Sequence, residues 1–172
     1  VLFPMVSTKT QAEKVIKSTF YPPYGTRGCG PLRANRYGFD DAGKYFNHTC
    51  LEMAWLIQIE TEEAVNNLDD ILEVPNIDGF IFGYCDLSAS VGELGRTSQP
   101  KTYRLIEQAG RKLLEKGKSF GFSHSNPPDN MIRFYLENGA NIVSAGVDFD
   151  YVLRGAVNMR NRVNSVRSAV SG

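Results

Sequence analysis

The sequence alternates between short apolar runs and longer amphipathic segments. Dense apolar runs are typical of buried parallel strands, and the segments between them carry apolar residues at helical spacing. The predicted strands are residues 2–6, 53–60, 77–84, 118–123 and 141–147. The predicted helices are residues 7–20, 40–49, 61–72, 100–116, 129–137 and 150–169. Because no hairpin signal joins two strands, this pattern predicts an α/β fold with a parallel sheet.

Length and composition limit the class of protein. The 172 residues fit a single domain spanning residues 1–172, and the 19 Lys+Arg balance the 19 Asp+Glu. A net charge of zero argues against nucleic acid or a membrane surface as the partner. The sequence contains no apolar run of about 18 residues, so we expect no transmembrane helix. Three cysteines (Cys29, Cys50 and Cys85) without C-x-x-C spacing favour a reducing compartment, and we expect a cytoplasmic protein.

Polar residues stand at or just after the carboxyl ends of the predicted strands, where α/β proteins place their functional groups. These residues are Gln58, Glu60, Asp86, His124 and Asp148. Side chains alternate along a strand, so Gln58 and Glu60 share one face of their strand and the opposite face is apolar. The face that carries Gln58 and Glu60 is predicted to point into a barrel interior or a crevice.

Glu60 and Asp86 are candidate metal ligands. Two carboxylates at neighbouring strand ends suit a hard divalent cation such as Mg²⁺ or Mn²⁺, with water and substrate oxygens completing the coordination. Gly83 lets the chain turn tightly before Asp86, and the amides that follow it can form an anion-binding nest. The alternatives are that Glu60 is a solvated or salt-bridged carboxylate and that Asp86 caps a turn.

Other candidates carry weaker signals. His124 is either a general base or a histidine bonded to the backbone, and His48 is expected on the surface. Neither G-x-G-x-x-G nor a Walker motif occurs, so the sequence gives no support for dinucleotide or nucleoside triphosphate binding. The last predicted helix has an apolar stripe that would face the core or another subunit. The stripe consists of Leu153, Ala156, Met159, Val163, Val166 and Val170.

Two strand-end motifs together resemble those of the HpcH/HpaI aldolases, the class II metal-dependent pyruvate aldolases of the phosphoenolpyruvate/pyruvate-domain superfamily. The motifs are LIQIET at residues 56–61 and DGFIFGYCDLS at residues 78–88. Further matching segments cover nearly the whole chain, at residues 4–6, 21–28, 33–35, 135–140 and 146–148. The resemblance implies a (β/α)8 TIM barrel. Such a barrel takes about 250 residues and at least about 200, so we expect the C-terminal five βα units here.

The resemblance also implies roles for residues of the site. Glu60 and Asp86 match the family's ligands to a divalent metal ion (Mg²⁺, Mn²⁺ or Co²⁺). Gln58 matches a residue that contacts the bound keto acid, and the amides of Cys85 and Asp86 match those that hold its carboxylate. The implied reaction is a lyase reaction, the cleavage of a 4-hydroxy-2-oxo acid or a 2-keto-3-deoxy sugar acid to pyruvate and an aldehyde through a metal-stabilised enolate.

The sequence departs from the family in two respects. Tyr84 stands where the family usually has proline. The family's catalytic histidine and arginine match positions before Val1, so no residue here is assigned to proton transfer. Three alternatives stay open: an oxaloacetate decarboxylase or related carbon–carbon lyase, a non-catalytic scaffold or binding chain, and a glycoside hydrolase with two catalytic carboxylates. The resemblance further implies a homo-oligomer that assembles through the C-terminal helix.

Overall fold

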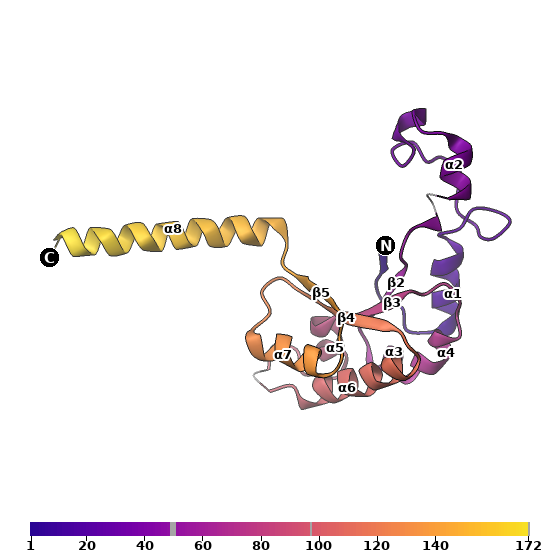
Figure 1. Cartoon of the computed structure of the whole chain (residues 1–172). Helices are drawn as coiled ribbons and strands as arrows, with labels where there is room; N and C mark the ends of the chain where they lie inside the picture. The colour runs from indigo at the N-terminus through magenta and orange to yellow at the C-terminus, as the bar shows by residue number, and fades with distance from the viewer. Residues whose placement is uncertain (49–50, 97, 172) are drawn as a thin grey trace.

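The sheet has five strands, all parallel, in the order in which they occur along the chain (Figure 1). The computed structural model describes residues 1–48, 51–96 and 98–171. The strands are β1 (Leu2–Phe3), β2 (Leu56–Ile59), β3 (Gly79–Phe82), β4 (Ser119–His124) and β5 (Ile142–Ala145). The alternating pattern of the sequence therefore predicted the fold class and the presence of all five strands, although some of their bounds differ.

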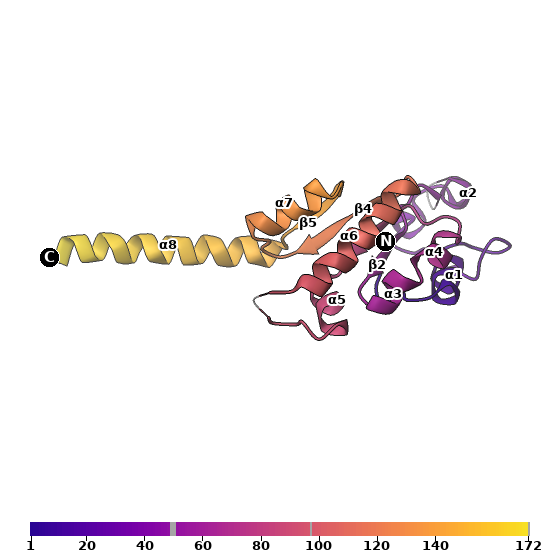
Figure 2. The ribbon, with the colours of Figure 1, turned by 90° about the horizontal axis from the view of Figure 1, so that it is seen from below.

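The helices lie mainly on one face of the sheet. They are α1 (Lys9–Lys17), α2 (Ala42–Asn47), α3 (Glu62–Asn66), α4 (Leu68–Leu72), α5 (Tyr84–Ser90), α6 (Pro100–Glu115), α7 (Asp129–Glu137) and α8 (Asp148–Ser171), with a 3-10 turn, η1, at Arg36–Gly38. Figures 1 and 2 show α3 to α7 together on that face. The segment with α2 extends to one side, and α8 projects away from the sheet on the other.

The hydrophobic core lies between the sheet and this helical layer. In β2 the side chains of Ile57 and Ile59 are fully buried, whereas Leu56 and Gln58 on the other face are only partly buried. This alternation confirms that one face of the strand packs against helices. Rings from β3, β4 and α7 fill the centre of the core. They are Phe80, Phe82, Phe120, Phe122 and Tyr135.

Four elements differ from their predictions. The helix predicted over residues 61–72 is divided at Asn67, whose side-chain amide donates to the carbonyl of Ser7 at 2.9 Å. The strand predicted over residues 2–6 is paired only at Leu2 and Phe3, because Met5 takes a left-handed backbone conformation with φ of 56°. The strand predicted over residues 77–84 ends at Phe82, and Tyr84 is instead the first residue of α5, a helix that was not predicted. The helix predicted over residues 40–49 is shorter, and Thr49 lies outside the described residues.

Two of the three cysteines lie in the described residues. Cys29 and Cys85 are exposed free thiols, and Cys50 lies outside the described residues. Within the described part of the chain, no helix combines the length and apolar character needed to cross a membrane.

Candidate functional site

The candidate site lies at the carboxyl ends of β2 and β3. Ile59 pairs with Phe82 in the parallel ladder, so the residues that follow them, Glu60 and Gly83, also lie side by side. The Gly83 amide donates to the Ile59 carbonyl at 3.0 Å, which continues the pairing to the end of both strands. Asp86 stands three residues beyond Gly83, in the first turn of α5. Two adjacent strands therefore bring the two candidate metal ligands to one edge of the sheet.

Glu60 is a buried carboxylate. Its side chain is 4% exposed, and its Oε2 accepts a hydrogen bond of 2.7 Å from the Met5 amide. Burial raises the pKa of Glu60, and the negative charge of Asp86 adds to this, while the Met5 amide acts in the opposite direction. Glu60 and Asp86 are therefore close enough to interact, and both the charge of Asp86 and a hydrogen bond with it disfavour the ionised form of Glu60.

Gly83 provides the space that these side chains occupy. A Cβ atom at Gly83 would lie 2.6 Å from Cγ of Glu60, 2.7 Å from its Oε1 and 2.8 Å from Nε2 of Gln58. Real Cβ atoms do not approach other atoms so closely, so the site requires glycine at this position. Gln58 and Glu60 thus both pack against the Gly83 backbone, as expected for residues on the same face of β2.

Cys85 and Asp86 are exposed in the first turn of α5. The first intrahelical hydrogen bond runs from the Leu87 amide to the Gly83 carbonyl. The amides of Cys85 and Asp86 precede this bond, and amides in this position of a helix have no carbonyl partner within it. They are therefore available to an anion, in keeping with the role expected for them.

The donor set fits a hard divalent cation. No ion pair involves Glu60 or Asp86 in the described residues, so the salt-bridge alternative for Glu60 finds no support there. The same residues contain no cluster of three or more His, Cys, Asp or Glu suited to a metal. Mg²⁺ often binds through one or two carboxylates and keeps several waters, so two protein carboxylates are sufficient.

His124 and Asp148 are engaged locally. Nδ1 of His124, at the end of β4, accepts a hydrogen bond of 3.0 Å from the Asn126 amide, as in the backbone-bonded alternative. Asp148 is exposed at the start of α8, and its carboxylate accepts from the Phe149 amide at 2.8 Å. His48 is exposed, as expected. These contacts give no reason to assign catalysis to either histidine.

Sequence reasoning did not find two contacts of the site. One is the Met5 amide, which reaches Glu60 across 55 positions of sequence because the left-handed conformation of Met5 turns the chain after β1. The other is a hydrogen bond from Tyr84 to Gln99. The only sequence signal for the second contact was the unusual tyrosine at position 84.

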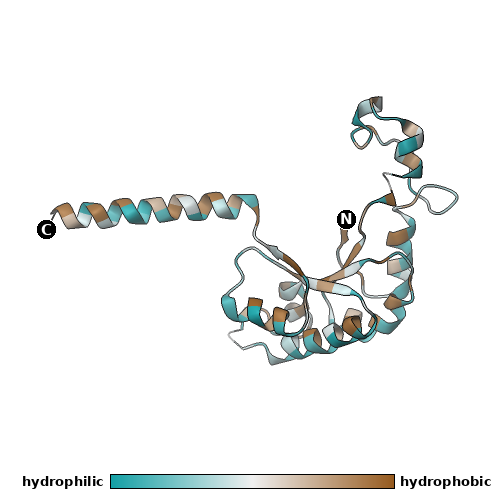
Figure 3. Cartoon of the chain, in the orientation of Figure 1, coloured by the Kyte–Doolittle hydropathy of each residue, from teal (hydrophilic) through white to brown (hydrophobic). Residues whose placement is uncertain are grey.

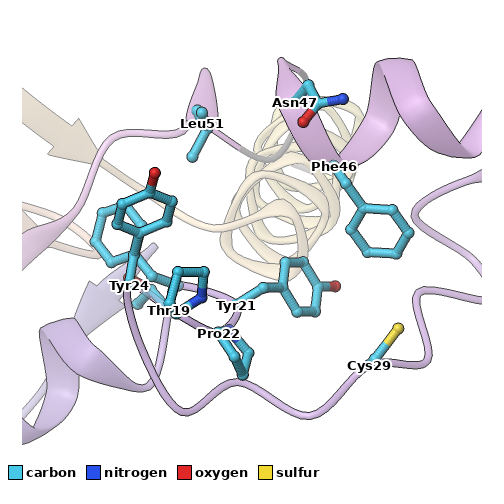
Figure 4. A pocket seen from close by; sticks show the side chains of 10 residues that line it. Thr19, Tyr21, Pro22, Tyr24, Cys29, Phe46, Asn47 and Leu51 are labelled. Carbon is cyan, nitrogen blue, oxygen red and sulfur yellow. The ribbon is translucent and has the colours of Figure 1, made fainter.

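An aromatic cavity of about 620 Å³ lies outside this site, in the segment between α1 and α2 (Figure 4). The ring centroids of Tyr21 and Phe46 lie 5.0 Å apart, and the Arg27 guanidinium lies 4.7 Å from the centre of the Tyr21 ring. Burial and a hydrogen bond with Tyr45 raise the pKa of Tyr21 to about 12. The cavity lining includes none of the predicted metal or substrate residues.

Comparison with known proteins identifies one family. The HpcH/HpaI aldolase/citrate lyase family matches residues 1–154. A 4-hydroxy-2-oxo-heptane-1,7-dioate aldolase of Escherichia coli is 36% identical over 170 residues, which cover 99% of this chain and 64% of that protein. A 2-keto-3-deoxy-L-rhamnonate aldolase of Escherichia coli is 41% identical over 150 residues, covering 86% of this chain and 55% of the relative. The chain thus spans less than two thirds of the length of these relatives.

Solved structures show the same fold. An HpcH/HpaI aldolase/citrate lyase family protein from Burkholderia cenocepacia superposes with a TM-score of 0.81 at 24% identity, covering 96% of this chain and 64% of that one. An HpcH/HpaI aldolase from Desulfitobacterium hafniense superposes with a TM-score of 0.77 at 25% identity, covering 94% of this chain and 62% of that one. The five-stranded sheet is therefore of the TIM-barrel type predicted from the sequence.

Proposed function

Since the chain belongs to the HpcH/HpaI aldolase/citrate lyase family, we propose that it carries the metal and substrate site of a lyase. The reaction is the cleavage of a 4-hydroxy-2-oxo acid, or a 2-keto-3-deoxy sugar acid, to pyruvate and an aldehyde. The observation that carries the proposal is the buried Glu60 beside Asp86, without a cationic side chain to pair with it in the described residues. The names of the two aldolase relatives support an oxo acid as the substrate.

Glu60 and Asp86 would hold the divalent cation, which can be Mg²⁺, Mn²⁺ or Co²⁺. When bound, it supplies positive charge where the keto oxygen of the substrate becomes negative as the carbon–carbon bond breaks. The Gln58 amide lies beside Glu60 at the Gly83 backbone, where it can donate to a bound keto acid. The amides of Cys85 and Asp86 hold the substrate carboxylate at the start of α5.

Glu60 also has a defined protonation behaviour in this proposal. Its raised pKa means that the metal-free site takes up a proton more readily than an ordinary carboxyl does. Because a ligating carboxylate must be ionised, a bound cation would compete with the proton for Glu60. Proton transfer to or from the substrate is assigned to no residue of the chain, and His124 is bonded to the backbone.

Pyruvate release tests the proposal. The purified chain with Mn²⁺ should release pyruvate from 4-hydroxy-2-oxo-heptane-1,7-dioate at a rate at least about tenfold above that of the same chain in EDTA. Release of pyruvate from oxaloacetate but not from 4-hydroxy-2-oxo-heptane-1,7-dioate would favour the decarboxylase alternative. If the chain binds pyruvate but releases none from either substrate, the result favours the scaffold alternative and contradicts lyase activity of this chain by itself.

The partner we propose besides the small-molecule substrate is a second copy of the chain, bound through α8. This helix projects from the sheet, and apolar residues recur along it (Figure 3). Its exposed apolar residues include Val152, Leu153, Met159, Val163, Val166 and Val170. Sedimentation should give a mass of at least two chains, and a monomer at micromolar concentration would contradict the assembly.

The location that we propose is the cytoplasm, and the exposed thiols of Cys29 and Cys85 support it.

A further inference from the structure

Tyr84 links the candidate site to the neighbouring helix. It is the first residue of α5, directly after Gly83 and two residues before Asp86. Its hydroxyl donates a hydrogen bond to Oε1 of Gln99, and its ring packs against that of Tyr103 with the centroids 5.8 Å apart. Gln99 and Tyr103 lie at the start of α6, which packs beside α5 (Figure 2). Tyr84 therefore connects the first turns of the two helices.

Glu93 holds the other end of this connection through its backbone carbonyl and its buried side chain. Nε2 of Gln99 donates to the Glu93 carbonyl at 2.8 Å. The Glu93 side chain, 4% exposed, accepts from the amide and the hydroxyl of Thr102, both at 2.9 Å, and from the Lys101 amide at 3.2 Å. Burial opposes the ionisation of Glu93, but these hydrogen bonds outweigh it and lower its pKa. Glu93 thus fixes the beginning of α6, and with it Gln99.

The first turn of α5 has few other restraints. The helix has seven residues, too short to be stable by itself, and Gly83 before it has no side chain that could cap it. Its buried residues, Leu87 and Ser88, come after the first turn. A proline in place of Tyr84 would fix the backbone at this position by its ring. Tyrosine lacks that restraint, and its hydrogen bond to Gln99 supplies another.

We propose that Tyr84 is a positioning residue for the metal site. Its hydroxyl, held by Gln99, fixes the first turn of α5 and so the place of the Asp86 carboxylate relative to Glu60. The inference rests on the proposed function, because it matters only if these two carboxylates bind a cation together. Tyr84 itself is not a ligand, and its effect passes through the backbone of α5.

The test is Mn²⁺ affinity in the full chain, measured by calorimetry at a temperature where every variant is folded. Tyr84→Phe keeps the ring and removes the hydroxyl, so the dissociation constant should rise about 3- to 10-fold, as expected for one lost hydrogen bond. Gln99→Leu should have a similar effect. The double variant should bind Mn²⁺ no more weakly than the single variant of lower affinity, because both substitutions break the same hydrogen bond. Tyr24→Phe, at an exposed tyrosine outside this network, is the matched control and should not change the affinity.

The result that would overturn the inference is a Tyr84→Phe chain with an affinity within twofold of the wild type. That outcome would make the hydroxyl a purely structural group even if the urea midpoint fell. The proposed function fails in a different way, when the wild-type chain itself does not bind Mn²⁺. In that case the positioning role is wrong as well.

Discussion

Replacing Glu60 by glutamine is expected to abolish tight Mn²⁺ binding and to stabilise the metal-free chain. The substitution removes one of the two proposed charged ligands, so the dissociation constant for Mn²⁺ should rise at least about 100-fold. Glutamine can still accept the hydrogen bond from the Met5 amide. The substitution also removes a buried negative charge beside Asp86. Because burial and Asp86 raise the pKa of Glu60, its ionised form destabilises the native state at pH 7, and a neutral glutamine removes that unfavourable contribution.

Glu62→Gln is the matched control for this prediction. Glu62 is exposed in the first turn of α3, where the helix dipole favours a negative charge. This variant should bind Mn²⁺ like the wild type and lose a few tenths of a kcal/mol of stability. Urea unfolding in EDTA measures the stability of both variants. A Glu60→Gln chain less stable than the wild type at pH 7 would contradict the electrostatic description of the site.

Replacing Gly121 by alanine is expected to destabilise the fold more than most single substitutions. Gly121 in β4 pairs with Ile142 in β5, and an added Cβ would lie 1.6 Å from the Ile142 carbonyl oxygen. The obstacle is backbone, so the two strands must move apart for alanine to fit. We expect a loss of about 3 kcal/mol or more in the free energy of unfolding.

Gly155→Ala provides the contrast. Gly155 lies in α8, and a Cβ there would meet nothing within 4 Å. Alanine in a helix is favoured over glycine by about 0.5–1 kcal/mol, so this variant should be slightly more stable. Urea unfolding of both variants checks the pair. A Gly121→Ala chain within about 1 kcal/mol of the wild type would show that β4 and β5 do not pair in this register.

The parts of the structure that follow from local periodicity were predictable from the sequence. The two faces of β2 could be assigned because side chains alternate, which placed Ile57 in the core and Gln58 with Glu60 on the other face. The proximity of Glu60 and Asp86 followed because the carboxyl ends of adjacent parallel strands meet at one edge.

The parts that depend on long-range contacts were not predictable. The seven residues of α5 are too few to show a clear helical period. The break at Asn67 is accompanied by a hydrogen bond to Ser7, 60 residues away. The Met5 amide and the Gln99 side chain reach the site from other elements of the fold. No signal in the sequence indicated the contact of the Met5 amide, and the tyrosine at position 84 was the only signal for the contact with Gln99.

The central claim is that Glu60 and Asp86 together bind one divalent cation, and Mn²⁺ titration at several pH values tests it most directly. For the wild type, the affinity should rise with pH while Glu60 loses its proton, by up to about tenfold per unit, and then level off. This rise should extend above the ordinary glutamate value of about 4.3, because the pKa of Glu60 is raised. Glu60→Gln and Asp86→Asn should each remove tight binding at every pH. Tight binding of Mn²⁺ that persists in both variants would contradict the account.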